Sequence, residues 1–300
     1  MAKLKANYEN AAILVTGDST GVYNGPNTNW VEFMGQDLAA QFPAYTVKKA
    51  AWNDTSGAYD PMVTVATGTG PNTLTIYNAS VSGKTFEYPL ASRLENLAGA
   101  IQPDLILMNN GHNESGTLDP VRIPERAITA VESLRVACAS ASVIVMSQNP
   151  RIDIATTPPN IEGIRAGYFR KVAQLMGYGF VDIHQAFVDS GNVAGLLNSD
   201  GLHPNAAGSR LWADNIKAAL TYNKSASPLT MAPPAFYVPG VNLLPNGDFK
   251  QFPSPPALPN WTATMPRSRK TPRTGNQATA TLSGCSQRRG ALSHSSSRAA

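Results

Sequence analysis

A serine, an aspartate and a histidine lie in two short motifs that could together carry out nucleophilic chemistry. Ser19 lies in "TGDST", directly after an apolar run, and a serine hydroxyl becomes an effective nucleophile only when a base removes its proton. Asp200 and His203 are three residues apart in "DGLHPN". One compact turn can therefore set the carboxylate against imidazole Nδ1 and leave Nε2 as a general base. Taken separately, Ser19 also fits a helix or turn cap, and "DGLHPN" fits a loop that caps the following helix.

A third motif could stabilise the negative charge that such a reaction creates. In "NNGHNES", Asn113 could offer its side-chain amide to a developing oxyanion, and Gly111 allows the backbone to turn sharply. When this motif is taken alone, an ordinary Asn/Gly turn is the better explanation of the same residues.

The segments around these motifs alternate between strand and helix patterns. Strands are expected at residues 11–17, 44–52, 103–111, 141–150 and 179–184, and helices at residues 30–42, 93–101, 124–139, 161–176 and 205–222. This alternation is typical of an α/β fold in which helices cover both faces of a parallel sheet. Ligands bind beyond the carboxyl ends of the strands in such sheets, which is where Ser19 and Asn113 are expected.

Two other parts of the chain differ in composition. Residues 64–88 alternate apolar and polar side chains around Gly and Asn, so we expect an inserted hairpin there. The main domain at residues 1–222 is expected to be followed by a Pro-rich linker at 223–240, a possible truncated β-module at 241–264 and a basic, disordered tail at 265–300.

The distribution of charge argues against a nucleic-acid partner. The formal net charge is +4, but residues 266–300 contain seven Lys or Arg and no Asp or Glu, so the rest of the chain is mildly acidic. We interpret the basic tail as a solvated end.

No apolar run reaches the roughly 18 residues of a membrane span, and no export signal is evident. We therefore expect a cytoplasmic or virion-associated protein.

The remaining residue types indicate neither a metal nor a cofactor. Cys138 and Cys285 lie far apart and suggest no disulfide framework. No pair of histidines has zinc-ligand spacing, and no Gly-rich loop resembles a phosphate cradle. The sequence indicates no particular oligomeric state.

Ser19, Asn113, Asp200 and His203, in that order, resemble the motifs of the SGNH, or GDSL-type, serine hydrolases. The family's first block is matched by "TGDST", its third by "GHNE" and its fifth by "DGLHP", and the resemblance covers about residues 11–221. It implies a flavodoxin-like three-layer α/β/α sandwich with a central parallel five-stranded sheet. It also implies that Ser19 is the nucleophile, His203 the base and Asp200 the acid that orients the base.

The same resemblance implies an oxyanion hole and shows two departures from the family. The donors would be the backbone N–H groups of Ser19 and Gly57 and the side-chain amide of Asn113, since Gly57 in "WNDTSGAY" matches the second block best. Thr20 replaces the usual aliphatic residue after the serine, and Glu114 replaces the Asp that commonly follows the asparagine. Neither departure changes an atom with an expected catalytic role.

The resemblance predicts a serine esterase that hydrolyses short-chain carboxylic esters through an acyl-serine intermediate. "NLLPNGDF" at residues 242–249 is similar to the opening strand of jelly-roll carbohydrate-binding modules. With the polar segment at 64–88, it favours O-deacetylation of an acylated carbohydrate. The alternatives are acyl transfer to an alcohol, lipase or thioesterase activity on the same triad, and a non-catalytic protein of a virion or cell surface. An intact triad argues against the last alternative.

Overall fold

The part of the chain that carries the expected motifs forms one structural unit. The computed structural model describes residues 4, 6–7, 9–22, 28–114, 121–153 and 161–221. The chain divides into a unit of residues 1–226 and a second unit of residues 227–300, and all described residues belong to the first. The expected linker, β-module and basic tail lie outside the described residues.

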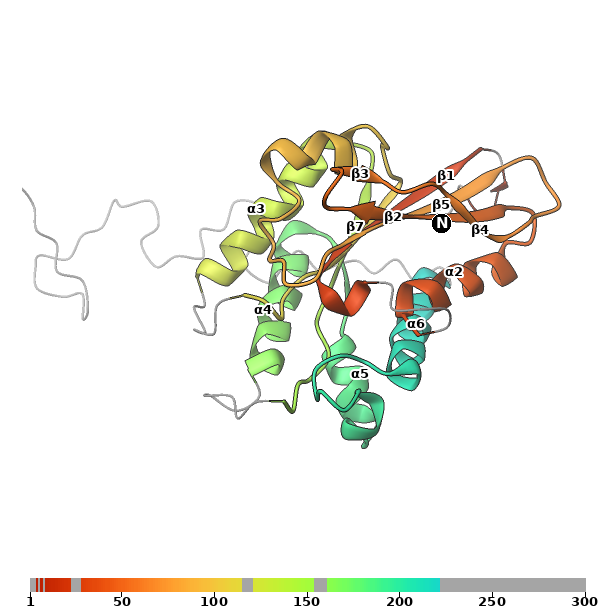
Figure 1. Ribbon diagram of the computed structural model, residues 1–300. Helices are drawn as coiled ribbons and strands as arrows, with labels where there is room; N and C mark the ends of the chain where they lie inside the picture. The colour runs from red at the N-terminus through yellow and green to blue at the C-terminus, as the bar shows by residue number, and fades with distance from the viewer. Residues whose placement is uncertain are drawn as a thin grey trace, which may run out of the picture. The chain divides into compact units, whose positions relative to one another are not determined.

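A mainly parallel sheet runs through the centre of the first unit (Figure 1). Within the described residues it has eight strands: β1 (Ala11–Gly17), β2 (Thr46–Asn53), β3 (Ala58–Tyr59), β4 (Val63–Ala66), β5 (Thr73–Ser80), β6 (Leu105–Asn109), β7 (Ser142–Met146) and β8 (Gly179–Val181). Strands β2, β5, β1, β6, β7 and β8 are parallel neighbours in that order, and β3 and β4 pair antiparallel with β2. The predicted α/β class is confirmed, and the described sheet has eight strands where five were expected.

The segment at residues 64–88 is not an inserted hairpin. Thr73–Ser80 forms β5, which lies inside the sheet and pairs in parallel with β1 on one side and β2 on the other. Val63–Ala66 forms β4 and pairs with β2. A polar residue in so central a strand is tolerated where its side chain is hydrogen-bonded. Asn78, for example, donates to the Gly21 carbonyl at 2.7 Å.

Helices cover both faces of this sheet. They are α2 (Trp30–Gln41), α3 (Arg122–Ala137), α4 (Ile161–Met176), α5 (Ile183–Asp189) and α6 (Ala206–Thr221). The helix expected at 93–101 consists of a 3₁₀ turn at Ala91–Arg93 and a π turn at Glu95–Gly99. The strand expected at 179–184 ends at Val181 because Asp182 caps α5, its side chain accepting the Gln185 N–H at 3.1 Å.

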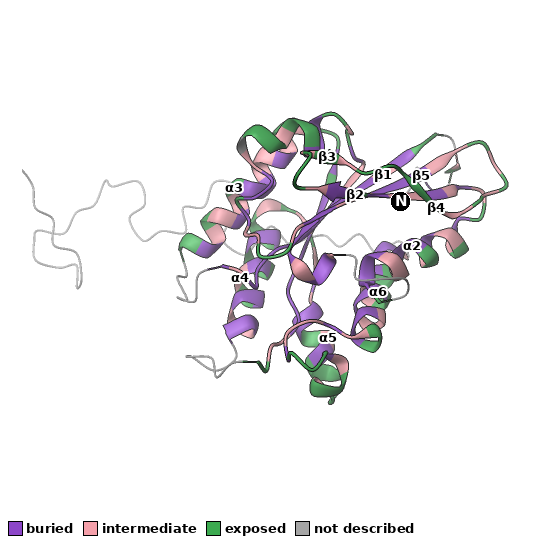
Figure 2. Ribbon diagram, in the orientation of Figure 1, coloured by how far each residue is buried: buried purple, intermediate pink, exposed green. Residues whose placement is uncertain are grey.

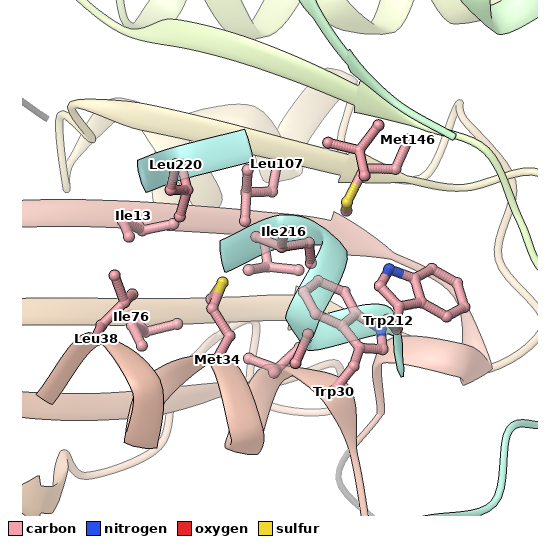
Figure 3. Close-up of a cluster of buried hydrophobic side chains, with 14 of the residues drawn as sticks. Ile13, Trp30, Met34, Leu38, Ile76, Leu107, Met146, Trp212, Ile216 and Leu220 are labelled. Carbon is pink, nitrogen blue, oxygen red and sulfur yellow. The ribbon is translucent and has the colours of Figure 1, made fainter. Parts of the chain in front are cut away.

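Two apolar clusters, one on each face, hold the layers together. Ile13 and Val15 of β1 join the cluster beneath α2, α5 and α6, where Trp30 and Trp212 stack with ring centroids 5.6 Å apart (Figure 3). Leu14 points to the other face and joins the cluster formed with α3 and α4. The central strands β1 and β6 are consequently buried on both sides (Figure 2), and polar residues lie in the loops at their carboxyl ends. Among the described helices, none combines the length and the apolar character that a membrane crossing needs.

Candidate active site

Ser19 lies directly beyond the carboxyl end of β1. Asp18 caps the 3₁₀ turn Ser19–Gly21, since its side chain accepts the Thr20 N–H at 3.0 Å. The turn closes when the Gly21 N–H donates to the Asp18 carbonyl at 3.1 Å. This short turn leaves Ser19 half-buried at the carboxyl end of the central strand β1, while Asp18 and Thr20 on either side are buried.

A buried polar network lies beneath the serine and accounts for the threonine at position 20. The Thr20 hydroxyl donates to Asp18 Oδ1 at 2.8 Å and accepts from Asn109 Nδ2 at 3.2 Å. Gln148 Nε2 donates to Asp18 Oδ2 at 3.0 Å. Burial raises the pKa of Asp18 to about 6, although hydrogen bonds from Thr20 oppose the increase. An aliphatic residue at position 20 would leave the facing polar groups without this partner.

The structure brings Asp200, His203 and Ser19 into one hydrogen-bonded chain. His203 Nδ1 lies 2.7 Å from Asp200 Oδ2, and His203 Nε2 lies 2.8 Å from Ser19 Oγ. With the proton on Nδ1, the ring donates to the carboxylate and Nε2 accepts from the serine hydroxyl. This is the arrangement in which imidazole can remove the serine proton.

The loop that carries His203 is held from several sides. Gly201 adopts φ +67°, a conformation that favours glycine. The His203 carbonyl accepts the Asn198 N–H at 2.8 Å, and Asn149, which follows β7, donates its side-chain amide to the Leu202 carbonyl at 2.9 Å. The imidazole is therefore positioned by both its own loop and the neighbouring strand end.

Asp200 remains ionised because three donors surround it. Partial burial alone would raise its pKa, but the Leu202 and His203 N–H groups, at 2.9 and 3.0 Å from Oδ1, and the His203 ring outweigh that effect and hold the pKa at about 2. The Asp200 side chain is 48% exposed and that of His203 28% exposed. The carboxylate is thus the more exposed partner in its contact with the imidazole.

Asn113 lies in the loop after β6, as expected, and its amide is already oriented. Its Nδ2 donates to the Lys84 carbonyl at 3.1 Å, which uses one of the two N–H groups of the amide. The Glu114 carboxylate accepts the Phe86 N–H at 2.8 Å and pairs with Arg126 at 3.0 Å. The loops after β5 and β6 are therefore joined next to Asn113.

The structure does not place Gly57 with these residues. Gly57 lies in the turn after β2, and its N–H donates to the Asn53 carbonyl at 2.9 Å. Strand β5 separates β2 from β1, so this turn is two strand spacings, about 10 Å, from the end of β1. Its N–H is thus both already bonded and remote from Ser19.

Gly83, which the sequence motifs do not single out, follows the strand next to β1 and so lies nearer to the end of β1 than Gly57 does. Gly83 has φ +75° and belongs to the turn after β5, where the Val81 N–H donates to the Gly17 carbonyl at 3.1 Å. The signal was available, since Gly83 follows the alternating run "TLTIYNAS" by three residues. Interpretation of that run as part of a hairpin hides its place beside β1.

The other histidine in this region has a structural environment. His112 is buried and donates from Nε2 to the Asn149 carbonyl at 2.9 Å, and burial lowers its pKa to about 3. Among the described residues, no three His, Cys, Asp or Glu side chains form a group that could hold a metal ion.

Comparisons with known proteins bear on the family and the fold of the chain. The family model described as the GDSL-like Lipase/Acylhydrolase family matches residues 15–211. No curated protein matches the chain.

Solved structures share the fold at low sequence identity. A protein from Parabacteroides merdae described as a GDSL-like lipase is 18% identical, with a TM-score of 0.52 over 70% of this chain and 95% of that one. A lipase/acylhydrolase from Enterococcus faecalis is 18% identical, with a TM-score of 0.50 over 70% and 95%. A catalytic mutant of Axe2, an acetylxylan esterase from Geobacillus stearothermophilus, is 15% identical, with a TM-score of 0.50 over 72% and 96%.

The matched segment contains every motif that resembled the SGNH pattern, and it covers more than half of the chain. The α/β fold with its mainly parallel sheet is the fold of the solved structures that match. The chain belongs to the GDSL-like lipase/acylhydrolase family of SGNH hydrolases and is a carboxylic ester hydrolase.

Proposed function

We propose that Ser19, His203 and Asp200 form the catalytic triad of a serine esterase that acts on short-chain esters. The observation that carries this proposal is the chain of contacts from Asp200 Oδ2 through the imidazole to Ser19 Oγ, at 2.7 and 2.8 Å. Ser19 Oγ attacks the ester carbonyl while His203 Nε2 takes the hydroxyl proton. His203 returns that proton to the leaving alcohol as the ester C–O bond breaks. Water then attacks the acyl-serine while His203 takes its proton, and the acid is released when the acyl–Oγ bond breaks and His203 returns the proton to Ser19 Oγ.

The oxyanion of the tetrahedral intermediate needs hydrogen-bond donors near Ser19, at the carboxyl ends of the same strands. We assign this role to the Ser19 N–H, the second N–H of the Asn113 amide and the Gly83 N–H in place of that of Gly57. The turn containing Gly83 follows β5, which pairs with β1, and the neighbouring Lys84 carbonyl already holds the Asn113 amide at 3.1 Å. Such donors stabilise the transition state because their orientation is fixed before reaction.

An acetylated glycan is the substrate that we favour. The turn after β2 presents exposed polar residues, including Asp54, Thr55 and Ser56. Large exposed apolar side chains of the described residues are scattered over several elements, with Met62 and Val63 the adjacent pair. A lipase for long acyl chains would need a broad apolar surface. One structure with the same fold is described as a mutant of an acetylxylan esterase, which makes an acetylated oligosaccharide a reasonable first substrate to test.

Hydrolysis of esters of different chain length tests the proposal. We expect kcat/KM for p-nitrophenyl acetate to exceed that for p-nitrophenyl octanoate, and we expect acetate release from acetylated oligosaccharides. Ser19→Ala should abolish both activities. The same variant is also the control for contaminating esterases. A kcat/KM that increases with chain length would contradict the glycan proposal and favour a lipase or thioesterase.

A further inference from the structure

One buried arginine holds the turn that carries Asn113 at two points. Arg165 lies in α4, and its side chain is only 2% exposed. Its Nη1 donates to the Gly111 carbonyl at 3.2 Å, and its Nη2 donates to the Glu114 carbonyl at 2.9 Å. A single planar guanidinium therefore fixes both ends of the four-residue turn 111–114.

The Glu114 side chain joins the same turn to a second segment of the chain and to α3. Its Oε1 accepts the Phe86 N–H at 2.8 Å, and Oε2 accepts from Arg126 of α3 at 3.0 Å. The carboxylate is fully buried. Two residues before Phe86, the Lys84 carbonyl accepts the Asn113 amide at 3.1 Å. The side-chain amide of Asn113 is thus oriented by a segment that Glu114 itself anchors.

The charge on Arg165 is balanced by a carboxylate of its own helix. Arg165 Nη1 donates to Glu162 Oε1 at 3.0 Å, and both side chains are almost completely buried. Burial raises the pKa of Glu162 to about 7, while Arg165 opposes this increase. Buried ion pairs can often be replaced by apolar residues with no loss of stability. Two bonds of Arg165 to backbone carbonyls are directed at this one turn.

We propose that Arg165 and Glu114 are positioning residues that orient the Asn113 amide for oxyanion stabilisation. This inference rests on the proposed function, because it assigns the two residues a role in that same site. Arg165 holds the backbone of the turn, and Glu114 holds the segment that accepts the Asn113 amide. Both act through Asn113.

The variant Arg165→Lys tests the first half. Lysine keeps the positive charge beside Glu162, but a single ammonium group lacks the planar pair of nitrogens that reaches both carbonyls. We expect kcat for p-nitrophenyl acetate to fall about 10- to 100-fold with little change in KM, because a misplaced oxyanion donor weakens binding of the transition state more than of the substrate. Arg170→Lys, on the same helix at a half-exposed position, is the matched control and should keep wild-type kcat.

Coupling to Asn113 separates positioning from a general effect on structure. In an Asn113→Ala background, Arg165→Lys should lower kcat by much less than it does in the wild type. Glu114→Leu should behave in the same way, whereas Glu114→Gln keeps an acceptor for the Phe86 N–H and should retain more activity. If Arg165→Lys does not fold, the double variant Glu162→Leu/Arg165→Met removes both buried charges and should fold with reduced kcat.

Wild-type kcat in folded Arg165→Lys, or an equal loss with and without Asn113, would overturn the inference. These outcomes differ from failure of the proposed function. If the wild-type protein shows no ester hydrolysis that depends on Ser19, the proposed triad itself is wrong, and the positioning role is overturned with it.

Discussion

At the scale of single residues, Asp200 is held by more than its bond to the imidazole. Oδ1 accepts the N–H groups of Leu202 and His203, and Oδ2 faces His203 Nδ1 at 2.7 Å. The loop can therefore keep its shape when the charge of the carboxylate is removed. This makes a chemical test of its orienting role possible.

Asp200→Asn should fold normally and lose most of its activity. The asparagine amide can keep the two N–H bonds through Oδ1, but its Nδ2 would face Nδ1 as a donor and favour the wrong imidazole tautomer. A loss of about 10⁴-fold in kcat follows from the comparable change in serine proteases. Steady-state kinetics of Asp200→Asn and His203→Ala would measure the loss of kcat. A thermal unfolding scan would show whether Asp200→Asn folds normally. Wild-type activity of Asp200→Asn, with His203→Ala inactive, would mean that another group orients the histidine.

His112 predicts how stability depends on pH. Its folded-state pKa lies at about 3, below its ordinary value of 6.5, because burial disfavours the charged ring. Below pH 6.5 the unfolded state binds a proton that the folded state does not, so the free energy of unfolding falls as pH falls from 6.5 towards 3. In His112→Gln, which can still donate to the Asn149 carbonyl, this contribution should disappear.

Urea unfolding of both proteins at pH 7 and pH 4.5 would measure the difference. Asp18 and Glu162, whose raised pKa values act in the opposite direction, are present in both proteins and cancel in the comparison. An equal loss of stability in wild type and His112→Gln would contradict the neutral, buried state of this ring.

The residues of the site differ in how far the sequence could predict them. Ser19, Asp200, His203 and Asn113 have reactive side chains in short motifs, and the structure places them in the loops where they were expected. A glycine offers only its backbone N–H, so its letter carries no chemical signal. Position along the chain points to Gly57, whereas the position of Gly83 in space depends on which strand lies beside β1.

At the scale of elements, β5 is the strand whose place inside the sheet the sequence pattern does not predict. A strand buried on both faces usually reads as a continuous apolar run, whereas Thr73–Ser80 includes Thr75, Asn78 and Ser80. Asn78 is accommodated by its bond to the Gly21 carbonyl. Pairing between distant strands is a property of the folded sheet, so local pattern alone could not reveal it. The strands and helices with strong apolar periodicity were predicted close to their observed bounds.

The end of β1 requires a glycine. Gly17 pairs in register with Ser80 of β5 and Asn109 of β6. A Cβ at position 17 would overlap Asn109 Oδ1 and lie 2.9 Å from Ser80 Oγ. Asn109 cannot turn away without losing its bond to Thr20.

Gly17→Ala should therefore destabilise the fold and displace Ser19. Overpacking of this kind costs about 1–3 kcal/mol, and kcat should fall because Ser19 lies two residues further on. Gly167→Ala is the matched control, since a Cβ there meets no atom within 4 Å and alanine is favoured inside a helix by about 1 kcal/mol. Equal stability of the two variants, measured by urea unfolding, would show that the strand end relaxes around the methyl group.

At the scale of the whole molecule, both apolar clusters lie within residues 4–220. They bury the two faces of one sheet, and the site is assembled at its edge from loops after β1, β5, β6 and β7 and before α6. A chain ending after Ala226, the last residue of the first unit, should keep the melting temperature and the kcat/KM for p-nitrophenyl acetate of the full-length protein. Loss of folding on truncation would show that residues 227–300 contribute to the core.

Covalent labelling by a fluorophosphonate tests the central claim, that Ser19 is an activated nucleophile, whatever the natural ester is. The account predicts one label on the wild-type protein, mapped to Ser19 by peptide mass spectrometry, no label on Ser19→Ala and slow labelling of His203→Ala. Ser56→Ala, which removes an exposed serine of the turn after β2, should label at the wild-type rate. Labelling of Ser19→Ala as strongly as the wild type, or an unlabelled wild-type protein, would contradict the account.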